Sequence, residues 1–417
     1  MRQLLNVMRS CYKTARLKKE SSETLKKRRL YLWQELQKTL LKTPALSHLA
    51  GLQLSDLPIL SPIQIRQDIT KWNSLGIDHK EAFDAAKNAE EGGSGEIFPG
   101  VTSGFSTGTS GNRGVFITTQ EERSIYLGQN IAKLLSFRSI FSGIKIMLFL
   151  RANNRLYSDS GRSVLFQYQY CSLALTTDEK IKAIEKFKPN ILIAPSHTLL
   201  DLAINGLNHL NLKHCFYGAE PMGDHERDWI KSRIGVRPDP IYQATEGFLG
   251  FPCAFGKLHL NEDSLEIELE AIEGTNGYQI IATDLLRKTQ PIVRVKLDDF
   301  IELDQTLCKC GFAGRTILPI CGRVQDLWRF HNNIITPRQV INILEQTLGA
   351  ACKWQAIASD SGVTLLVEAN TPHELVQNSA AKLTTSLGLK CPIKIGTLGG
   401  DVITIKRQRI KWENGNE

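Results

Sequence analysis

Residues 191–235, ILIAPSHTLLDLAINGLNHLNLKHCFYGAEPMGDHERDWIKSRIG, alternate between two kinds of segment. The runs ILIAPS (191–196) and HCFYGAE (214–220) are short and largely apolar, which is typical of buried strands. The runs HTLLDLAINGL (197–207) and PMGDHERDWIKSRIG (221–235) have the length and composition of helices. Strands and helices that alternate in this way predict a parallel sheet with covering helices.

The same pattern begins earlier in the chain and then changes. IKIMLFL (144–150) is a further buried strand, and DEKIKAIEKF (178–187) is an amphipathic helix. Beyond residue 255 several short strands separated by turns predict a β-rich unit: LHLNED, SLEIELE, GYQIIATDL, QPIVRVKL and DFIELD. Toward the end of the chain, helices around TPRQVINILEQTL and HELVQNSAAKLTTSL alternate with strands around KWQAIASD, VTLLVEA and IKIGTL.

These patterns predict an α/β fold with two domains. We expect a large N-terminal domain of β-sheets flanked by helices at residues 91–322, with a β-rich subdomain at about 255–322. A helical segment at residues 1–90 should pack on the large domain. A small α+β domain should follow at residues 327–417. A chain of 417 residues is too long for one ordinary core, which agrees with this division.

Composition excludes several classes of protein. Hydrophobic residues make up 42% and charged residues 23%, as in globular proteins. No run of 18 apolar residues is present, so no transmembrane segment is expected. The first residues lack a signal-peptide pattern, which predicts a cytoplasmic protein. Nine cysteines, an odd number in a long chain, argue against a disulfide framework and favour reduced thiols or a metal site.

The net charge is +8, and much of the excess lies in the first thirty residues and in the run IKRQRIKWENGNE. A solvated helix face explains such an excess most simply. A weak contact of the basic N-terminus with an anionic membrane surface, or an acidic partner such as a carrier protein, would also suit it. Because no nucleic-acid-binding motif is present, we expect no nucleic-acid partner.

The run TSGFSTGTSGNRG (102–114) is rich in glycine, serine and threonine. Glycine lets the backbone approach a ligand closely, so that consecutive N–H groups can surround phosphate oxygens. The run is not a Walker A loop, because no G-K-[ST] closes it. Residues 104–108 fit G-x-S-x-G, but a hydrolase nucleophile elbow needs a strand before the serine and a helix after it. The loop alone leaves a phosphate site, a hydrolase and a flexible linker open.

Later motifs give the loop a context. GAEP (218–221) and YQATEG (242–247) each follow a predicted strand, TDLLRKTQPIVRVKLDD (283–299) and GR (322–323) come next, and a basic tail closes the series. In this order the motifs resemble the adenylate-forming superfamily. The likeness is closer to its phenylacetate-CoA ligase branch, which also holds the synthetases that adenylylate a deazaflavin coenzyme. It extends from about residue 95 to 340 and is carried by STGTSGNRG, LFLRANNRLY, YQATEGFLGFPC, LHLNED and RKTQPIVR.

The resemblance implies roles in holding ATP. The phosphate-binding loop would grip the β- and γ-phosphates, with added charge from Arg113, through Ser106, Thr107, Gly108, Thr109, Ser110 and Gly111. Glu246 would hold Mg²⁺, because a hard cation prefers carboxylate oxygen, and Thr245 would bond the α-phosphate. The resemblance also implies that the small C-terminal domain is mobile. Lys406, from this domain, would complete adenylation, with Lys411 as second choice.

A second set of residues would hold the nucleoside. Tyr242 would lie along the adenine, next to Gly218, Ala219 and Glu220. Asp299 would bind the ribose hydroxyls by two hydrogen bonds, helped by Arg323. The chain departs from the family at two places. The loop lacks the usual Pro-Lys before its last glycine, and Gln325 occupies a hinge position that is usually charged.

Four residues have the character of a metal site. Cys308 and Cys310 are separated by one residue, and Cys253 and His259 form a C-x5-H pair. Together they would complete a tetrahedral structural zinc site, with Cys321 as a spare ligand. Free buried thiols are the alternative.

The implied function is ATP-dependent activation of a carboxylic acid as an acyl-adenylate, with release of pyrophosphate and transfer to a thiol of CoA or a carrier protein. The branch suggests an aromatic or acyl acid. Its pocket should be formed by the 150–200 region, with Arg151, Asn153, Tyr157 and His197 as candidate polar contacts. Transfer of AMP to a hydroxyl group and a non-catalytic nucleotide-binding protein remain alternatives.

Overall fold

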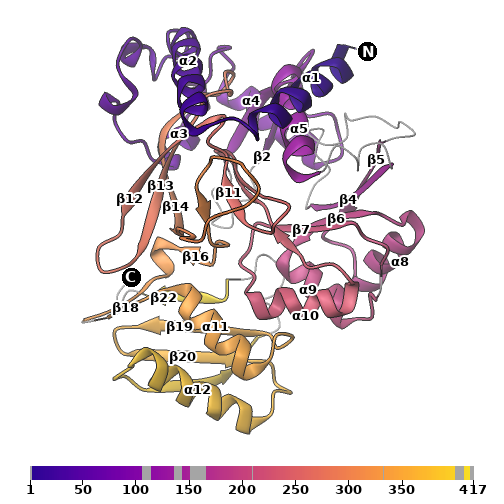
Figure 1. Ribbon diagram of the computed structural model, residues 1–417, viewed down its shortest axis with the longest axis vertical. Coiled ribbons are helices and arrows are strands. Elements are labelled where there is room, and N and C mark those ends of the chain that lie inside the picture. The colour runs from indigo at the N-terminus through magenta and orange to yellow at the C-terminus, as the bar shows by residue number, and fades with distance from the viewer. Residues whose placement is uncertain are drawn as a thin grey trace.

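The computed structural model describes most of the chain, namely residues 2–105, 114–135, 143–150, 166–208, 210–331, 333–399 and 408–413. Figure 1 shows α1 and α2 at one end of the molecule and the unit containing α11 and α12 at the other. A parallel sheet and a group of antiparallel strands lie between them.

The parallel sheet forms the centre of the larger part. Its order is β5-β4-β6-β7-β8 and all four pairings are parallel. The strands are β4 (Ile144–Leu150), β5 (Phe166–Ser172), β6 (Ile191–Pro195), β7 (His214–Gly218) and β8 (Asp239–Pro240). The predicted parallel sheet and the α/β fold class are therefore confirmed.

Helices cover both faces of this sheet. One face buries an apolar cluster against α8 (Thr177–Phe187), α9 (Ser196–Ile204) and α10 (Asp224–Ile234). The other face packs against the end of α5 (Gln120–Leu134). Sequence explains where α8 begins and ends, because Thr176 forms a capping box and Lys188, before a proline, adopts a φ of 51°.

Helices make up much of residues 2–90. The helices are α1 (Arg2–Leu17), α2 (Ser22–Leu40), α3 (Pro62–Gln67) and α4 (His79–Glu90), with short 3₁₀ turns η1 (Ser47–Leu49), η2 (Leu54–Asp56) and η3 (Ile69–Trp72). Leu36 and Leu40 of α2 are fully buried in the same core as Val295 of the antiparallel strands. The helical segment thus packs on the larger part through a shared core.

Three antiparallel sheets complete the larger part. The first has β1 (Glu96–Phe98), β2 (Val101–Phe105) and β3 (Val115–Thr119). The second, in order β15-β11-β10-β9, has β9 (Tyr242–Ala244), β10 (Gly247–Pro252), β11 (Leu258–Leu260) and β15 (Thr316–Ile317). The third has β12 (Leu265–Ala271), β13 (Gly277–Asp284), β14 (Ile292–Glu302) and β16 (Gly322–Arg323). The β-rich region thus starts at Tyr242, before the expected residue 255.

The C-terminal unit follows the short turn η4 (Val324–Asp326). Its strands are β17 (Trp328–Phe330), β18 (Asn333–Ile335), β19 (Trp354–Ser359), β20 (Gly362–Val367), β21 (Ile393–Thr397) and β22 (Ile410–Glu413), and its helices are α11 (Pro337–Leu348) and α12 (His373–Leu387). These elements share a core of their own. A separate core supports a domain boundary near η4.

A buried charge cluster joins the C-terminal unit to α10 of the larger part. The two terminal nitrogens of Arg409, just before β22, lie 2.6 Å from Glu226 of α10 and 2.6 Å from Glu345 of α11. The Glu345 carboxylate also accepts hydrogen bonds from the N–H groups of Gly223 and Glu226, at the start of α10. A Cβ on Gly223 would lie 2.1 Å from that carboxylate, so this close approach requires glycine.

Candidate functional site

The glycine-rich loop connects two neighbouring antiparallel strands. Phe105, the last residue of β2, pairs with Val115, the first residue of β3. The predicted phosphate-binding residues lie outside the described part of the chain: Ser106, Thr107, Gly108, Thr109, Ser110, Gly111 and Arg113. The next described element after these residues is β3, a strand, whereas a nucleophile elbow leads directly into a helix, so the G-x-S-x-G match does not indicate a hydrolase.

A cavity of about 420 Å³ lies between α5 and the parallel sheet. Its walls are mainly apolar, with contributions from Ile131 of α5, Leu148 of β4 and Phe216 of β7. Two groups of predicted nucleotide-binding residues line the same cavity: Gly218, Ala219 and Glu220 at the end of β7, and Thr245 after β9. The fold therefore brings together residues that are far apart in the sequence. Arg151, Asn153 and Tyr157 lie outside the described residues.

The carboxylate of Glu220 is held at the start of α9. It accepts hydrogen bonds from the Ser196 hydroxyl at 3.0 Å and from the His197 backbone N–H at 3.1 Å. It also lies 2.8 Å from His197 Nδ1. An acidic group is favoured at a helix N-terminus, where N–H groups have no partner within the helix. Glu220 thus fixes His197, which lines the cavity.

Glu246 lies in a polar corner formed by three distant segments. Its carboxylate is buried, and Oε1 is 3.5 Å from Nη2 of Arg66 in α3. Burial raises the pKa of Glu246, and the Arg66 charge opposes that rise. Gly114, the first described residue after the glycine-rich loop, also abuts Arg66, since a Cβ there would lie 2.9 Å from the arginine Cγ. The end of the loop, Arg66 and Glu246 are therefore adjacent.

Two arginines near this corner were not among the site residues predicted from the sequence. Arg66 belongs to the helical N-terminal segment, where no local motif marks it. Arg287 is partly buried, and its Nη1 donates a hydrogen bond to the Thr245 carbonyl at 2.5 Å. Arg287 begins the run RKTQPIVR, which carries part of the family resemblance, so the sequence could have identified this residue as part of the site.

The predicted nucleoside residues Tyr242, Asp299 and Arg323 also lie together. The Tyr242 hydroxyl donates a hydrogen bond to Asp299 Oδ2 at 2.9 Å, and Asp299 is the cross-strand partner of Arg323 between β14 and β16. Burial and the neighbouring Asp299 carboxylate raise the pKa of Tyr242 well above its usual value. Tyr242 is therefore a neutral hydrogen-bond donor at physiological pH.

The candidate lysines are placed unequally. Lys406 lies outside the described residues. Lys411 is on β22, where its ammonium is 2.6 Å from Glu413 and half exposed. Gln325 of η4 is exposed, whereas its neighbour Asp326 is buried and accepts a hydrogen bond from Gln408 at 3.0 Å.

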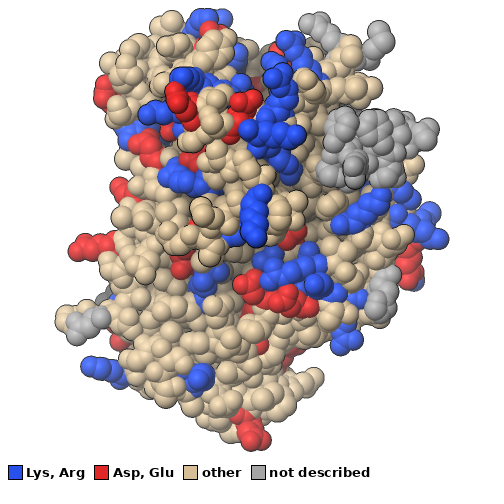
Figure 2. Space-filling model, in the orientation of Figure 1, with Lys and Arg blue, Asp and Glu red and all other residues tan. Residues whose placement is uncertain are grey.

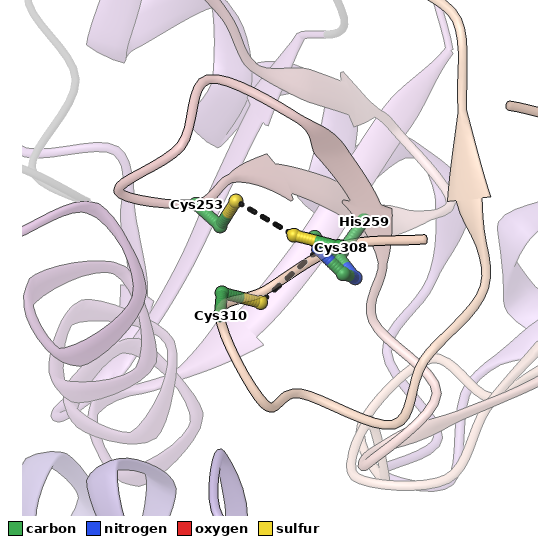
Figure 3. A group of neighbouring side chains, drawn as sticks. All are labelled: Cys253, His259, Cys308 and Cys310. Carbon is green, nitrogen blue, oxygen red and sulfur yellow. Dashed lines mark hydrogen bonds between the residues drawn. The ribbon is translucent and has the colours of Figure 1, made fainter. Parts of the chain in front are cut away.

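The four predicted zinc ligands converge at one point (Figure 3). Cys253 follows β10, His259 is in β11, and Cys308 and Cys310 belong to the loop between β14 and β15. All four ligand atoms lie within 4.8 Å of one another. The sulfurs of Cys253 and Cys308 are 3.5 Å apart, and Cys310 Sγ is 3.3 Å from His259 Nε2. Cys321 is not part of this group.

The surroundings orient the histidine toward the sulfurs. His259 Nδ1 is 2.9 Å from the Gly314 carbonyl, so a proton on Nδ1 leaves the Nε2 lone pair facing Cys310. Phe251 and Phe312 pack against the His259 ring. The two phenylalanine rings therefore exclude water from one side of the group, and the His259 imidazole has a defined orientation.

Comparison with known proteins agrees with the sequence resemblance. No family model matches the chain. A curated phenylacetate-coenzyme A ligase from Thermus thermophilus is 26% identical over 186 residues, which is 40% of this chain and 42% of that relative. The matched stretch thus spans about two fifths of the relative's length.

Solved structures match the fold over nearly the whole chain. A 2-hydroxyisobutyryl-CoA ligase in the postadenylation state, in complex with R3-HIB-AMP, has a TM-score of 0.72 at 13% identity, covering 96% of this chain and 91% of that one. The same ligase with 2-HIB-AMP and CoA in the thioesterification state has a TM-score of 0.56 at 14% identity, covering 96% and 92%. This chain thus has the fold of this CoA ligase. No described helix is long and apolar enough to cross a membrane.

Proposed function

We propose that this protein is an ATP-dependent, adenylate-forming ligase of carboxylic acids. One observation carries the proposal, namely that the ends of β7 and β9 meet at a single apolar cavity. Thr245 lines that cavity, and the neighbouring Tyr242 is hydrogen-bonded to Asp299. An acid and a nucleotide bound at these places would have their reacting groups side by side, which is the main requirement of the reaction.

The proposed chemistry has two steps. A carboxylate oxygen of the acid forms a bond to the α-phosphorus of ATP, the α–β phosphoanhydride bond breaks, and pyrophosphate leaves with the electron pair. A thiol then attacks the acyl carbon of the adenylate, and AMP leaves. Asp299 would accept hydrogen bonds from the ribose hydroxyls, and Tyr242 would hold Asp299 in place. Gly218, Ala219 and Glu220 would adjoin the adenine, and Lys406 would assist the first step.

Glu246 would bind Mg²⁺ together with the phosphates that the glycine-rich loop grips. Its buried carboxylate suits this ion, which usually takes one or two protein carboxylates and keeps several water ligands. When bound, Mg²⁺ would neutralise charge on the phosphates. Arg66, 3.5 Å from Glu246, and Arg287, which holds the Thr245 carbonyl, would add positive charge and keep this corner rigid.

The acid would carry an uncharged, hydrophobic body, either aromatic or acyl. The cavity volume of about 420 Å³ is in the range of small-molecule sites, and its walls are mainly apolar. Burying a second charge against Ile131, Leu148 and Phe216 would cost free energy. The acceptor would be the thiol of CoA or of a carrier protein.

Trapping with hydroxylamine tests this proposal and its main alternative together. The protein with MgATP and a series of aromatic and aliphatic acids should release pyrophosphate and give acyl hydroxamates. The Glu246→Gln variant should lower the rate about 100-fold by weakening phosphate positioning, whereas Glu273→Gln, at an exposed turn, should not. Pyrophosphate release with a hydroxyl acceptor, but no hydroxamate with any acid, would favour AMP transfer instead.

We also propose a structural zinc ion at Cys253, His259, Cys308 and Cys310. A tetrahedral ion with zinc–sulfur bonds of about 2.3 Å separates two thiolates by roughly 3.8 Å, close to the observed 3.5 Å. A disulfide would need a separation of about 2 Å. The ion would link the β14–β15 loop to β10 and β11. These two strands belong to the same sheet as β9, which contains Tyr242.

A further inference from the structure

The positive charge of this protein is concentrated in one short region. Residues 1–29 contain ten lysines and arginines and two glutamates, so they alone account for the net charge of +8. The remaining residues hold 41 basic and 41 acidic side chains and are balanced. Figure 2 shows lysine and arginine side chains gathered over α1, at the end of the molecule opposite the C-terminal unit.

The orientation of α1 is fixed by its contact with α5. Val7, Ser10 and Thr14 are buried on the face that meets α5. The Ser10 hydroxyl donates a hydrogen bond to the Ile125 carbonyl at 2.8 Å, and Gly128 of α5 lets the two backbones approach closely. The helix therefore cannot rotate to hide its other side chains without losing this packing.

The outward side of α1 carries an apolar stripe. Leu4, Leu5, Met8 and Tyr12 are about 60% exposed, at 61%, 58%, 60% and 62%. Residues separated by three or four positions lie on one helical face, so these side chains form a continuous strip. Four large apolar side chains exposed together indicate a contact surface.

A basic stripe runs beside the apolar one. Arg9, Lys13 and Arg16 follow each other at helical spacing on the adjoining sector, and α1 contains no acidic residue. Neighbouring apolar and basic stripes are the pattern of helices that lie in the interface of a bilayer. The apolar side chains enter the boundary between headgroups and acyl chains, and the cations pair with lipid phosphates.

We propose that the outward face of α1 docks the protein on an anionic membrane surface. A second copy of this face is a poor occupant, because Arg9, Lys13 and Arg16 would meet like charges. An acidic protein would satisfy the cations but does not by itself account for the adjoining strip of Leu4, Leu5, Met8 and Tyr12. This surface is distant from the C-terminal unit and independent of the proposed reaction.

Vesicle sedimentation tests the proposal on the full chain. Wild-type protein should bind vesicles of phosphatidylcholine with phosphatidylglycerol, should not bind phosphatidylcholine alone, and should bind less as salt increases. Replacing Arg9, Lys13 and Arg16 by glutamine should lower the affinity roughly 100-fold, with each cation contributing about one lipid contact. Replacing Leu5, Met8 and Tyr12 by serine should lower it at least about tenfold. These side chains are exposed, so circular dichroism and thermal unfolding should be unchanged.

The matched control removes the same charge elsewhere. Lys382, Lys390 and Lys394 of the C-terminal unit are exposed, and their triple glutamine variant should bind vesicles like the wild type. Equal loss in this control would show attraction by net charge and would overturn the proposal. So would failure of the wild type to bind anionic vesicles. Vesicle binding that depends on the α1 cations but not on Leu5, Met8 and Tyr12 would show that the apolar stripe does not enter the bilayer and would overturn the proposal as well.

Discussion

Two buried charge clusters in this protein resemble each other in chemistry but differ in position. In the larger part, Lys133 of α5 lies 2.5 Å from Asp263 and 2.6 Å from Asn261, and both charged side chains are almost fully buried. Between the two parts, Arg409 lies 2.6 Å from both Glu226 and Glu345, and all three side chains are equally buried.

Position decides what each cluster can do. Lys133 on α5 and Asp263, in the turn between β11 and β12, both belong to the larger part, so they separate only when that part unfolds. Arg409 and Glu345 belong to the C-terminal unit, whereas Glu226 belongs to α10. Arg409 and Glu345 separate from Glu226 whenever the two units move apart, and water then solvates all three side chains. The same kind of ion pair therefore stabilises a fold in one place and an arrangement of domains in the other.

The Lys133→Met variant should have the largest effect on stability. It leaves Asp263 buried without its cation, and such a loss costs about 3–5 kcal/mol. Equilibrium unfolding in urea measures this difference. The Lys38→Met control breaks an exposed pair with Glu35 and should change the free energy of unfolding by less than about 0.5 kcal/mol. Equal effects in the two variants would remove the distinction between buried and exposed pairs here.

Asp284 is a partly buried carboxylate on the cavity wall, and its titration can be tested through the pH dependence of stability. Its hydrogen-bond donors are the N–H groups of Leu286 and Arg287, and burial raises its pKa to about 6. Because the folded-state pKa is raised, the folded protein binds this proton more tightly. The resulting stability is complete below about pH 4 and is lost as pH rises through 6.

Asp284→Asn removes this titration. Between about pH 4 and 7 the wild type should lose roughly 3 kcal/mol relative to the variant, which is two pKa units. Unfolding free energies measured across this range for both proteins provide the comparison. Parallel pH profiles would contradict a raised pKa for Asp284.

Arg409→Met should loosen the domain arrangement and leave the larger part stable. Without Arg409, the carboxylates of Glu226 and Glu345 would be buried with no cation beside them. Separation of the two units would expose both carboxylates to water and remove an unfavourable free energy of about 2 kcal/mol or more. Small-angle scattering and the distance between labels on α2 and α12 should report a more open molecule. Lys411→Met, on the same strand but half exposed, is the control. An unchanged distance distribution in Arg409→Met would refute this role for the cluster between the domains.

Cys308→Ser should have a smaller and more local effect. The protein should contain about one zinc per chain by elemental analysis, and the variant should contain little. The cluster adjoins Lys133 through Phe251 and Phe312, whose rings lie 5.1 Å and 5.8 Å from the Lys133 ammonium. Zinc loss should therefore lower the melting temperature by a few degrees, about 1 kcal/mol. Cys352→Ser, a partly buried thiol elsewhere, is the matched control. Wild-type protein free of metal would contradict the site.

Regular elements and short motifs were accessible from the sequence because their signals are local. Apolar periodicity identified the strands around Leu148 and Phe216. The C-x5-H spacing predicted that Cys253 and His259 approach one another, and they do so because β10 and β11 form a hairpin. The Arg66–Glu246 and Arg409–Glu226 contacts leave no such signal, since their partners are 180 or more positions apart and depend on packing between separate elements.

The most direct test of the central claim is acid-dependent exchange of radiolabelled pyrophosphate into ATP. We expect exchange by the wild type that requires Mg²⁺ and a hydrophobic carboxylic acid, falls about 100-fold in Glu246→Gln, and persists in Glu273→Gln. Folded wild-type protein that binds no MgATP by calorimetry and exchanges no pyrophosphate with any aromatic or aliphatic acid would contradict it.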